Sequence, residues 1–446
     1  MDHQLASYLH KRRDEYRTEL FELLRQPSVS ARGEGVEECA DLLVNILGRH
    51  GLNAETVPTS TAPVVYFDET VDESLPTVLF YGHYDVQPAD DADAWDSPPF
   101  DPEVRDSAIY ARGAGDNKGQ LLSHVFAVEA VRDVTGALPV NVTFVFEGGE
   151  ENDSLGFREF IDDHPERLDC DLVYVADGPM HDAGQPTILY GNRGLVSADV
   201  SLSSAATDLH SGNFGGPVPN PATQLVSVLA DLITDGRIQL DGFYDDVAIT
   251  DEDRRAVMDI PVHATTLRET LGLDSFTVPD EAYYETLLLE PTLSINGLRA
   301  GEIGPGLKTI IPSEAAAKLD IRLVPEQDPD EVFVALDAFV AERVPEAEID
   351  HIGTFPPMKT PLTTDYAGPI RDALADAWGV DPIDVPLLGG SLPVAYFRRT
   401  SDVPILIVPY ANPDQNNHSP NEHLDIECFE NGIRTSAAFL GHLGDS

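Results

Sequence analysis

The segment "TVLFYGHYDVQPAD" (residues 77–90) indicates the fold class of this chain. It begins with a run of β-branched, aromatic and aliphatic residues, which is typical of a buried strand. His83 and Asp85 follow two positions apart, where that strand ends. Because ligands of parallel sheets collect beyond the carboxyl ends of the strands, this pair stands where such a sheet would place a functional site.

Segments with helix character and strand character alternate around residues 77–90. The helix-like segments are "EECADLLVNILGRHG" (37–51) and "GQLLSHVFAVEAVRDV" (119–134), and the strand-like segments are "TVLFYGH" (77–83), "VNVTFVFEGGEE" (140–151) and "CDLVYVAD" (170–177). This rhythm predicts an α/β fold with a mostly parallel sheet sandwiched by helices.

The length of 446 residues is too great for one ordinary core and predicts two domains. After residue 193 the pattern changes to alternating polar and apolar strands with helices near 221–236 and 329–345, and the first pattern returns near the C-terminus. We therefore expect a first domain made of residues 1–193 and 356–446, with an α+β domain of residues 194–355 inserted into it.

The chain is strongly acidic, with 78 acidic against 28 basic residues and a formal net charge of −50. This charge argues against nucleic acid and anionic membrane surfaces as partners, since both require a positive footprint. The acidic residues are spread along a chain with 18 Phe and 14 Tyr, so we expect a folded protein with an acidic surface. A surface rich in carboxylates and poor in lysine suits a cytosol of molar salt and indicates a halophile, while an acidic mesophilic protein is the alternative.

Three cysteines, Cys39, Cys170 and Cys428, form no CxxC motif and no paired framework, which favours a reducing cytoplasm. The first 20 residues are typical of an amphipathic surface helix, without the apolar core of a secretion signal. No segment reaches the ~18 apolar residues of a membrane span. The sequence therefore predicts a soluble, cytoplasmic protein.

Metal-binding residue types gather where the predicted strands end. They are His83 and Asp85 after the first strand, Glu147, Glu150 and Glu151 in "FEGGEE", Asp177 in "YVAD", Asp116 in the loop "ARGAGDNKGQ", and His418 and His423 in "NNHSPNEH". Each group alone has a plainer explanation, such as a structural histidine, a helix N-cap, an exposed turn or a polar loop. Together they favour one site, because parallel strands bring their ends to one edge of the sheet.

Histidine nitrogens and carboxylate oxygens form a mixed ligand set that suits Zn²⁺, with Mn²⁺ or Co²⁺ as substitutes. Two metals about 3.5–4 Å apart, bridged by a carboxylate, would activate a water molecule and polarise a carbonyl group. A free carboxylate must then accept the proton. The adjacent residues Glu150 and Glu151 offer both a base and a ligand.

On these residues the chain resembles the metallopeptidase family that contains carnosine dipeptidases, carboxypeptidase G, acetylornithine deacetylase and succinyl-diaminopimelate desuccinylase. The resemblance covers nearly the whole chain. The family's motifs occur in its order as "GHYDVQP", "ARGAGDNKG", "EGGEENDS", "DLHSGNFGG", "IRLVP", "GGSLPV" and "HSPNE". The chain departs from the family pattern in two small ways. "EGGEE" has a second glycine where many relatives carry a bulkier or acidic residue, and "ARGAG" has a glycine where serine is common. Neither change removes a ligand.

The resemblance implies a zinc-peptidase-like fold and a role for each residue of the site. One metal would be bound by His83 and Asp177 and the other by Glu151 and His418, with Asp116 as the bridge, Glu150 as the general base and Asp85 as the residue that orients His83. The resemblance also implies a cis peptide bond between Asp116 and Asn117.

The inserted domain would act as a lid and dimerisation domain. His210 in "DLHSGNFGG" would then stabilise the oxyanion in the partner subunit's active site. A loop residue without such reach is the alternative for His210. Arg322, Gly390 and Ser391 match positions that hold the substrate's carboxylate, and an arginine fork suits that anion. A surface salt bridge is the alternative for Arg322.

We therefore predict a dizinc hydrolase that cleaves a peptide or amide bond beside a free carboxylate. The "GGSLPV" motif and the length favour a dipeptidase acting on small peptides, and a deacylase acting on N-acyl amino acids is the alternative. A structural Ca²⁺-binding protein would predict oxygen ligands only, which the two histidines oppose. A catalytically dead relative would have lost Glu150 or a ligand, and none is replaced.

Overall fold

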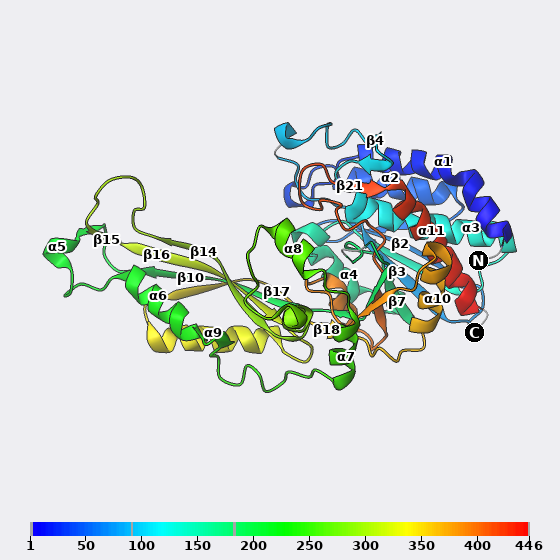
Figure 1. Cartoon of the computed structure of the whole chain (residues 1–446). Coiled ribbons are helices and arrows are strands. Elements are labelled where there is room, and N and C mark those ends of the chain that lie inside the picture. Colours follow the sequence, from blue (N-terminus) through cyan, green and yellow to red (C-terminus); the bar gives the residue numbers. More distant parts are fainter. Residues whose placement is uncertain (1–2, 91, 182–183, 445–446) are drawn as a thin grey trace. The chain divides into compact units, whose positions relative to one another are not determined.

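The computed structural model describes residues 3–90, 92–181 and 184–444 (Figure 1). The chain divides into two compact units. Unit 1 comprises residues 1–191, 360–386 and 396–446, and unit 2 comprises residues 192–359 and 387–395. Each unit has its own apolar core.

Unit 1 is built on an eight-stranded sheet with the order β1-β2-β6-β3-β7-β20-β8-β19. The four central strands, β6, β3, β7 and β20, run parallel to one another, while β2 and β8 are antiparallel to their central neighbours. The strands are β1 (Glu55–Val57), β2 (Val64–Glu69), β3 (Thr77–His83), β6 (Asn141–Glu147), β7 (Leu172–Val175), β8 (Thr187–Leu189), β19 (Ile383–Val385) and β20 (Ile405–Ile407). The predicted α/β fold with a mostly parallel sheet is confirmed.

Both faces of this sheet are covered. β3 is buried from residue 78 to residue 83, as expected for a central strand between two helical layers. Because successive side chains point to opposite faces, Phe80 contacts His124 of α3, whereas Tyr81 contacts Phe157 of α4. The helices of unit 1 are α1 (His3–Arg25), α2 (Val36–Arg49), α3 (Gly119–Thr135), α4 (Leu155–Asp163), α10 (Ala367–Trp378) and α11 (Ile426–Gly444).

The remaining short elements lie within unit 1, except that β18 belongs to unit 2 and that β9 and η8 span positions where the chain passes from one unit to the other. They are η1 (Ser30–Arg32), η2 (Ala92–Ala94), β4 (Glu103–Arg105), β5 (Ala108–Tyr110), η3 (Ala114–Lys118), η4 (Glu150–Asn152), η5 (Pro165–Leu168), β9 (Gly191–Asn192), β18 (Met358–Lys359), η8 (Pro393–Arg399) and β21 (His423–Asp425). β21, β5 and β4 form a small separate sheet, which fixes the end of the loop that carries His418.

Unit 2 contains a four-stranded antiparallel sheet with the order β14-β16-β10-β17. Buried and partly exposed residues alternate along β10 and β16, so one face of the sheet forms the core with α6 and α9. The elements of unit 2 are β10 (Gly194–Ser203), β11 (Leu209–His210), α5 (Ser211–Phe214), α6 (Pro221–Leu232), β12 (Ile233–Thr234), β13 (Arg237–Ile238), α7 (Asp251–Asp259), α8 (Ala264–Leu271), η6 (Asp280–Ala282), η7 (Glu285–Leu289), β14 (Thr292–Ala300), β15 (Ile310–Ile311), β16 (Glu314–Leu323), α9 (Pro329–Arg343) and β17 (Glu348–Phe355).

Within the described residues, none of the helices combines the length and the apolar character that a bilayer crossing requires.

Candidate metal centre

The carboxyl ends of three neighbouring parallel strands bring the predicted ligands together. His83 is the last residue of β3, Asp177 follows β7 by two positions, and Glu150 and Glu151 begin η4 just after β6. Asp116 lies in η3, directly before α3, and its peptide bond to Asn117 is cis, as the resemblance implies. The candidate ligands therefore meet at one edge of the sheet, as the positions of the strand ends predict.

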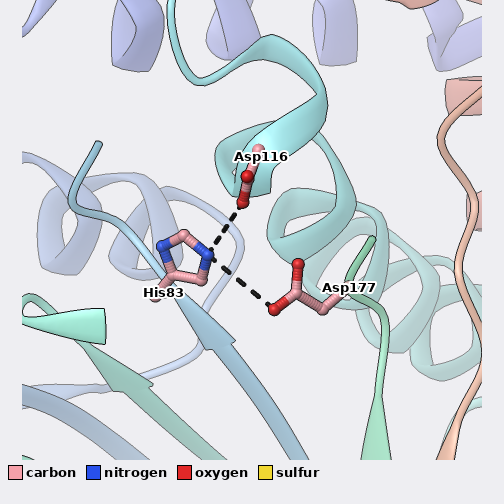
Figure 2. Close-up of side chains that lie close together, drawn as sticks. All are labelled: His83, Asp116 and Asp177. Atoms are coloured by element: carbon pink, nitrogen blue, oxygen red, sulfur yellow. Dashed lines mark hydrogen bonds and ion pairs between the residues drawn. The ribbon is translucent and has the colours of Figure 1, made fainter. Parts of the chain in front are cut away.

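The first group of candidate ligands lies around the Nε2 atom of His83. This nitrogen lies 3.1 Å from Oδ1 of Asp116 and 3.9 Å from Oδ2 of Asp177, and Figure 2 shows both carboxylates turned toward it. All three residues are buried. They can therefore surround one cation inside unit 1.

The second group shares Asp116 with the first. The Nε2 atom of His418 lies 3.1 Å from Oδ2 of Asp116 and 3.1 Å from Oε2 of Glu151. Asp116 thus presents one oxygen to each histidine. The side chain of His418 is 52% exposed, in contrast to the other ligands, so the second position is the more accessible one.

The spacing of the donor atoms fits two metal ions. In each group one donor atom per residue lies within 4.8 Å of the others. Zinc bonds of about 2.0–2.2 Å in tetrahedral geometry place neighbouring ligand atoms roughly 3.3 Å apart. The nitrogen–oxygen distances of 3.1 Å and 3.9 Å lie around this value. The mixture of imidazole and carboxylate also matches the preference of zinc.

The electrostatics of the site favour cations as well. Burial and the neighbouring carboxylates raise the pKa of Glu150 well above its usual value and raise the pKa of Asp177 to about 7. Among the described residues, no lysine or arginine forms an ion pair with Glu150, Glu151, Asp116 or Asp177. The two histidines relieve part of the repulsion among these buried carboxylates, and bound protons or metal ions would relieve the rest.

For the two histidines and Asp116 the surroundings favour the charged form, whereas for Glu150 and Asp177 they favour the neutral form. Hydrogen bonds with Asp116 and Glu151 raise the pKa of His418 to about 10. Burial by itself lowers the pKa of His83, but its hydrogen bonds with Asp116 and Asp85 raise it well above the usual value. Burial likewise raises the pKa of Asp116, and the two histidines more than reverse this and lower it. The nitrogens that hold these protons are the ones that bind a metal after deprotonation.

Asp85 connects His83 to the loop that carries Glu150 and Glu151. The Nδ1 atom of His83 lies 3.1 Å from the backbone oxygen of Asp85 and 3.4 Å from its carboxylate. The same carboxylate accepts hydrogen bonds from the backbone N–H groups of Glu150, at 3.2 Å, and Glu151, at 3.1 Å. A single buried carboxylate thus fixes both the ring of His83 and the start of η4.

Glu422 is a residue of the site that sequence reasoning missed. Its buried carboxylate accepts hydrogen bonds from the backbone N–H groups of Gly113, Gly115 and Asp116, each at 3.1 Å, and from Nη1 of Arg112 at 2.7 Å. It therefore ties the loop that carries Asp116 to the chain segment that carries His418. Its place in the motif "HSPNE", four residues after a candidate ligand, was the available signal.

The side-chain contacts of Asn117 were missed as well, since sequence reasoning named this residue only for its cis peptide bond. Its amide group donates hydrogen bonds to the backbone oxygen of Ala176, at 2.7 Å, and to Oδ1 of Asp177, at 3.1 Å. Its Oδ1 accepts a hydrogen bond from the backbone N–H of His83 at 3.4 Å. This side chain links the ends of β3 and β7.

Two candidates of the sequence lie outside both groups. Glu147 is buried and accepts a hydrogen bond from the hydroxyl of Tyr81 at 2.6 Å. His423 stacks on Tyr110, with ring centroids 4.7 Å apart. Both side chains thus have contacts of their own, and neither belongs to the two ligand groups.

The remaining predicted residues belong to unit 2. His210 is exposed at the end of β11, where its Nδ1 accepts a hydrogen bond from the backbone N–H of Gly212 at 3.0 Å. Nη1 of Arg322 donates to Oγ of Ser391 at 3.0 Å, and Gly390 precedes this serine. The structure therefore brings Arg322 and Ser391 together.

Known proteins resemble this chain over most or all of its length. The model of peptidase family M20/M25/M40 matches residues 79–442. The Cys-Gly metallodipeptidase dug1 of Schizosaccharomyces pombe is 30% identical over 99% of this chain and 98% of its own length. The Beta-Ala-His dipeptidase of Rattus norvegicus is 29% identical over 95% of this chain and 87% of its own.

A solved structure agrees with these relatives. The M20 family metallo-carboxypeptidase Sso-CP2 of Sulfolobus solfataricus has a TM-score of 0.90 to this chain and 32% sequence identity, and the comparison covers 100% of both chains. Fold, sequence and the arrangement of the candidate ligands lead to the same assignment. The chain belongs to peptidase family M20/M25/M40.

Proposed function

We propose that this protein is a dizinc dipeptidase that hydrolyses the peptide bond of a small peptide with a free carboxylate. The observation that carries the proposal is the position of Asp116, whose two oxygens face His83 and His418 separately. Glu150 belongs to neither ligand group, but it is buried close enough to Asp177, Glu151 and Asp116 for their charges to raise its pKa. The full-length similarity to two kinds of dipeptidase supports the choice of substrate class.

In this proposal His83, Asp116 and Asp177 hold one metal, and Asp116, Glu151 and His418 hold the other. Zinc suits the ligand set best, with Mn²⁺ or Co²⁺ as substitutes. When bound, the metals would polarise the scissile carbonyl and lower the pKa of the attacking water. Asp85 keeps the ring of His83 in place during this reaction, because it contacts Nδ1, the nitrogen that faces away from the ligand group.

Glu150 acts as the general base. It accepts a proton from the attacking water and returns it to the leaving amine. The hydrogen bond from its backbone N–H to Asp85 fixes the start of η4, so its carboxylate needs little reorganisation at the moment of transfer. The neighbouring ligand Glu151 is held by the same carboxylate.

Arg322, Gly390 and Ser391 bind the substrate's carboxylate. The guanidinium of Arg322 is half-buried and already hydrogen-bonded to Ser391, which orients its fork. A planar fork of N–H groups matches a carboxylate with two parallel hydrogen bonds. The serine hydroxyl can donate to the same anion.

A panel of substrates tests the proposal. Protein loaded with Zn²⁺, Mn²⁺ or Co²⁺ is assayed in molar salt against dipeptides, N-blocked dipeptides, N-acetyl amino acids and N-succinyl amino acids. We expect turnover of dipeptides to exceed the others. Turnover of N-acyl amino acids alone would contradict the dipeptidase assignment.

A carboxypeptidase is the second candidate, because the solved structure with a TM-score of 0.90 is described as a metallo-carboxypeptidase. Both activities cleave beside a free carboxylate, but only a dipeptidase requires the free amine of a two-residue substrate. Efficient release of the last residue from N-blocked or longer peptides would favour the carboxypeptidase.

We further propose that unit 2 is a lid and dimerisation domain that binds a second copy of this chain. β14 forms one edge of its sheet, and edge strands present unpaired backbone groups to a partner. The loop between β14 and β15 exposes Ile303, at 99%, and Leu307, at 93%. His210 pairs with Ile310 at the end of this loop, so it belongs to the surface that a second copy would cover.

Complementation of two inactive mutants tests whether His210 acts in the partner subunit's site. His210→Ala and Glu150→Gln are each expected to be inactive as pure dimers. In a mixed dimer with crossed histidines, one site carries both defects and the other carries none, so activity should approach half of wild type per heterodimer. Continued inactivity after confirmed subunit exchange would show that His210 does not act across the dimer.

We also propose a cytoplasmic, salt-adapted protein. The described cysteines Cys39, Cys170 and Cys428 are all unpaired, which suits a reducing compartment. Dilution into low salt should unfold or dissociate the protein, because a net charge of −50 would no longer be screened. Circular dichroism and light scattering that stay constant across a salt series would contradict the adaptation.

A further inference from the structure

Arg193 of unit 2 is a buried arginine without a carboxylate partner. Only 2% of the residue is exposed. Its guanidinium donates hydrogen bonds to three neutral acceptors, the backbone oxygens of Leu287 and Glu290 and the hydroxyl of Thr292, at 2.5, 2.9 and 2.7 Å. Within the part of the chain that the structure describes, no carboxylate lies within ion-pair distance of this group. Buried charges are normally paired, because desolvation is costly.

A second arginine lies beside it. In the sheet of unit 2, Thr292 of β14 is directly opposite Arg322 of β16, so the residue that accepts from Arg193 is the cross-strand neighbour of Arg322. Burial, and then the charge of Arg322, lower the pKa of Arg193 to about 10. The nearest carboxylate partner of Arg322 is Asp320, whose Oδ2 lies 3.4 Å from Nη2. Two positive charges are thus close together in a protein with a large excess of negative charge.

The backbone of Arg193 holds the segment that carries Ser391. Its N–H lies 3.1 Å from the carbonyl oxygen of Leu388 and 3.2 Å from that of Gly390. Ser391 in turn accepts from Arg322. Arg193 therefore contacts both sides of the proposed carboxylate site, the 287–292 segment through its side chain and the 388–390 segment through its main chain.

We propose that Arg193 is a positioning residue for the substrate's carboxylate, whose negative charge compensates this buried guanidinium. It does not touch the substrate. Its fixed charge adds to the positive field at Arg322, and its contacts hold Ser391 and Arg322 in place. The inference rests on the proposed function, in which the substrate carries a free carboxylate.

Removal of the charge without much change of length tests this. For Arg193→Met, KM and kcat are measured with a dipeptide, and an inhibition constant is measured for the same dipeptide with a C-terminal amide. We expect KM for the dipeptide to rise about tenfold or more while kcat changes little, because a fixed charge acts on binding of the anion. The inhibition constant of the neutral amide should change less than about threefold. An equal loss for both compounds would overturn the inference.

Two further variants keep the test decisive. Arg193→Lys retains the charge and loses the fork, so the preference for the carboxylate should remain near wild type even if thermal stability falls. If Arg193→Met does not fold, loss of that preference in Arg193→Lys overturns the proposal and its retention supports it. Arg343→Met is the matched control, because Arg343 carries a positive charge in the same unit but pairs with Asp231 and Glu342 at the surface.

The wild-type protein separates this inference from the proposed function. Equal affinity of the wild type for the dipeptide and its amide would contradict recognition of a free carboxylate, and with it the proposed function. A strong wild-type preference that Arg193→Met leaves unchanged would contradict only the role of Arg193.

Discussion

Unit 1 contains two clusters in which histidine stands between carboxylates, and they differ in what compensates the charge. His50 lies between Glu19, at 2.6 Å, and Glu129, at 3.7 Å. In this cluster Arg49 pairs with Glu19 at 3.0 Å and Arg12 pairs with Glu129 at 3.1 Å. The candidate metal centre combines the same residue types around Asp116 without an arginine or lysine in ion-pair contact among the described residues.

The pKa values of the carboxylates shift in opposite directions in the two clusters. Burial raises the pKa of Glu19 and Glu129, but hydrogen bonds with His50 and the nearby arginines outweigh this and lower both. In the candidate metal centre, burial and neighbouring carboxylates raise the pKa of Glu150, Glu151 and Asp177. A cluster of acids and histidines is therefore structural when arginine or lysine side chains pair with its carboxylates. It is a candidate cation site when no such side chain pairs with them.

The largest expected effect is that of Glu150→Gln. This variant should lose about 10²–10⁴-fold in kcat, because a proton acceptor is removed. Its metal content and melting temperature should stay near wild type, since Glu150 is not among the candidate ligands. Zinc content by elemental analysis and turnover are measured on the same sample. A loss of zinc that accounts for the whole defect would make Glu150 a ligand and not the base.

Glu422→Gln should weaken metal binding about 10–100-fold, because residues that hold ligands in place typically contribute this much. The reason is the loss of charge from the carboxylate that holds the Asp116 loop through three backbone N–H groups. Competition with a chromogenic chelator gives the affinity without recourse to activity. Glu427→Gln, an exposed change in the next helix, is the control and should bind metal like wild type.

His50→Gln should leave activity unchanged and reduce the free energy of unfolding by about 3 kcal/mol near pH 6. Burial lowers the pKa of His50, yet Glu129 and Glu19 raise it from 6.5 to about 9 in the folded protein. A group with a raised folded pKa stabilises below the unfolded value, and this contribution is lost as pH rises through the folded value.

The stability difference between wild type and His50→Gln should therefore shrink between pH 6.5 and about 9. Urea unfolding at a series of pH values measures it. A difference that does not depend on pH would mean that His50 contributes through packing alone. A drop in kcat would contradict the view that the cluster around His50 is structural and does not take part in catalysis.

Much of the fold was predictable from local pattern. The segment of residues 77–83 forms β3 as expected, because a continuous apolar run with β-branched and aromatic residues suits a strand buried on both faces. The helix expected at residues 119–134 is α3, which ends at Thr135 and is capped by Gly136 with φ of 84°. The convergence of His83 and Asp177 followed from parallel topology, since β3 and β7 are neighbours.

The residues that hold the site together were less predictable, because their partners are distant in sequence. Glu422 contacts backbone groups more than 300 positions earlier in the chain, and no periodicity reports such a contact. Glu129 is similar, because its position within a helix does not reveal that α1 supplies Tyr16 and Arg12 to compensate it.

The sequence by itself determined the alternation of strands and helices, the residue types of the ligand set and the acidic surface, because these depend on local composition and spacing. Only the tertiary structure decided which charges are compensated. Two arginines pair with the acids around His50, whereas only histidines pair with the described acids around Asp116. Arg193 is buried among neutral acceptors. Compensation depends on distances of a few ångströms between residues far apart in the chain, and the packing of the folded units sets those distances.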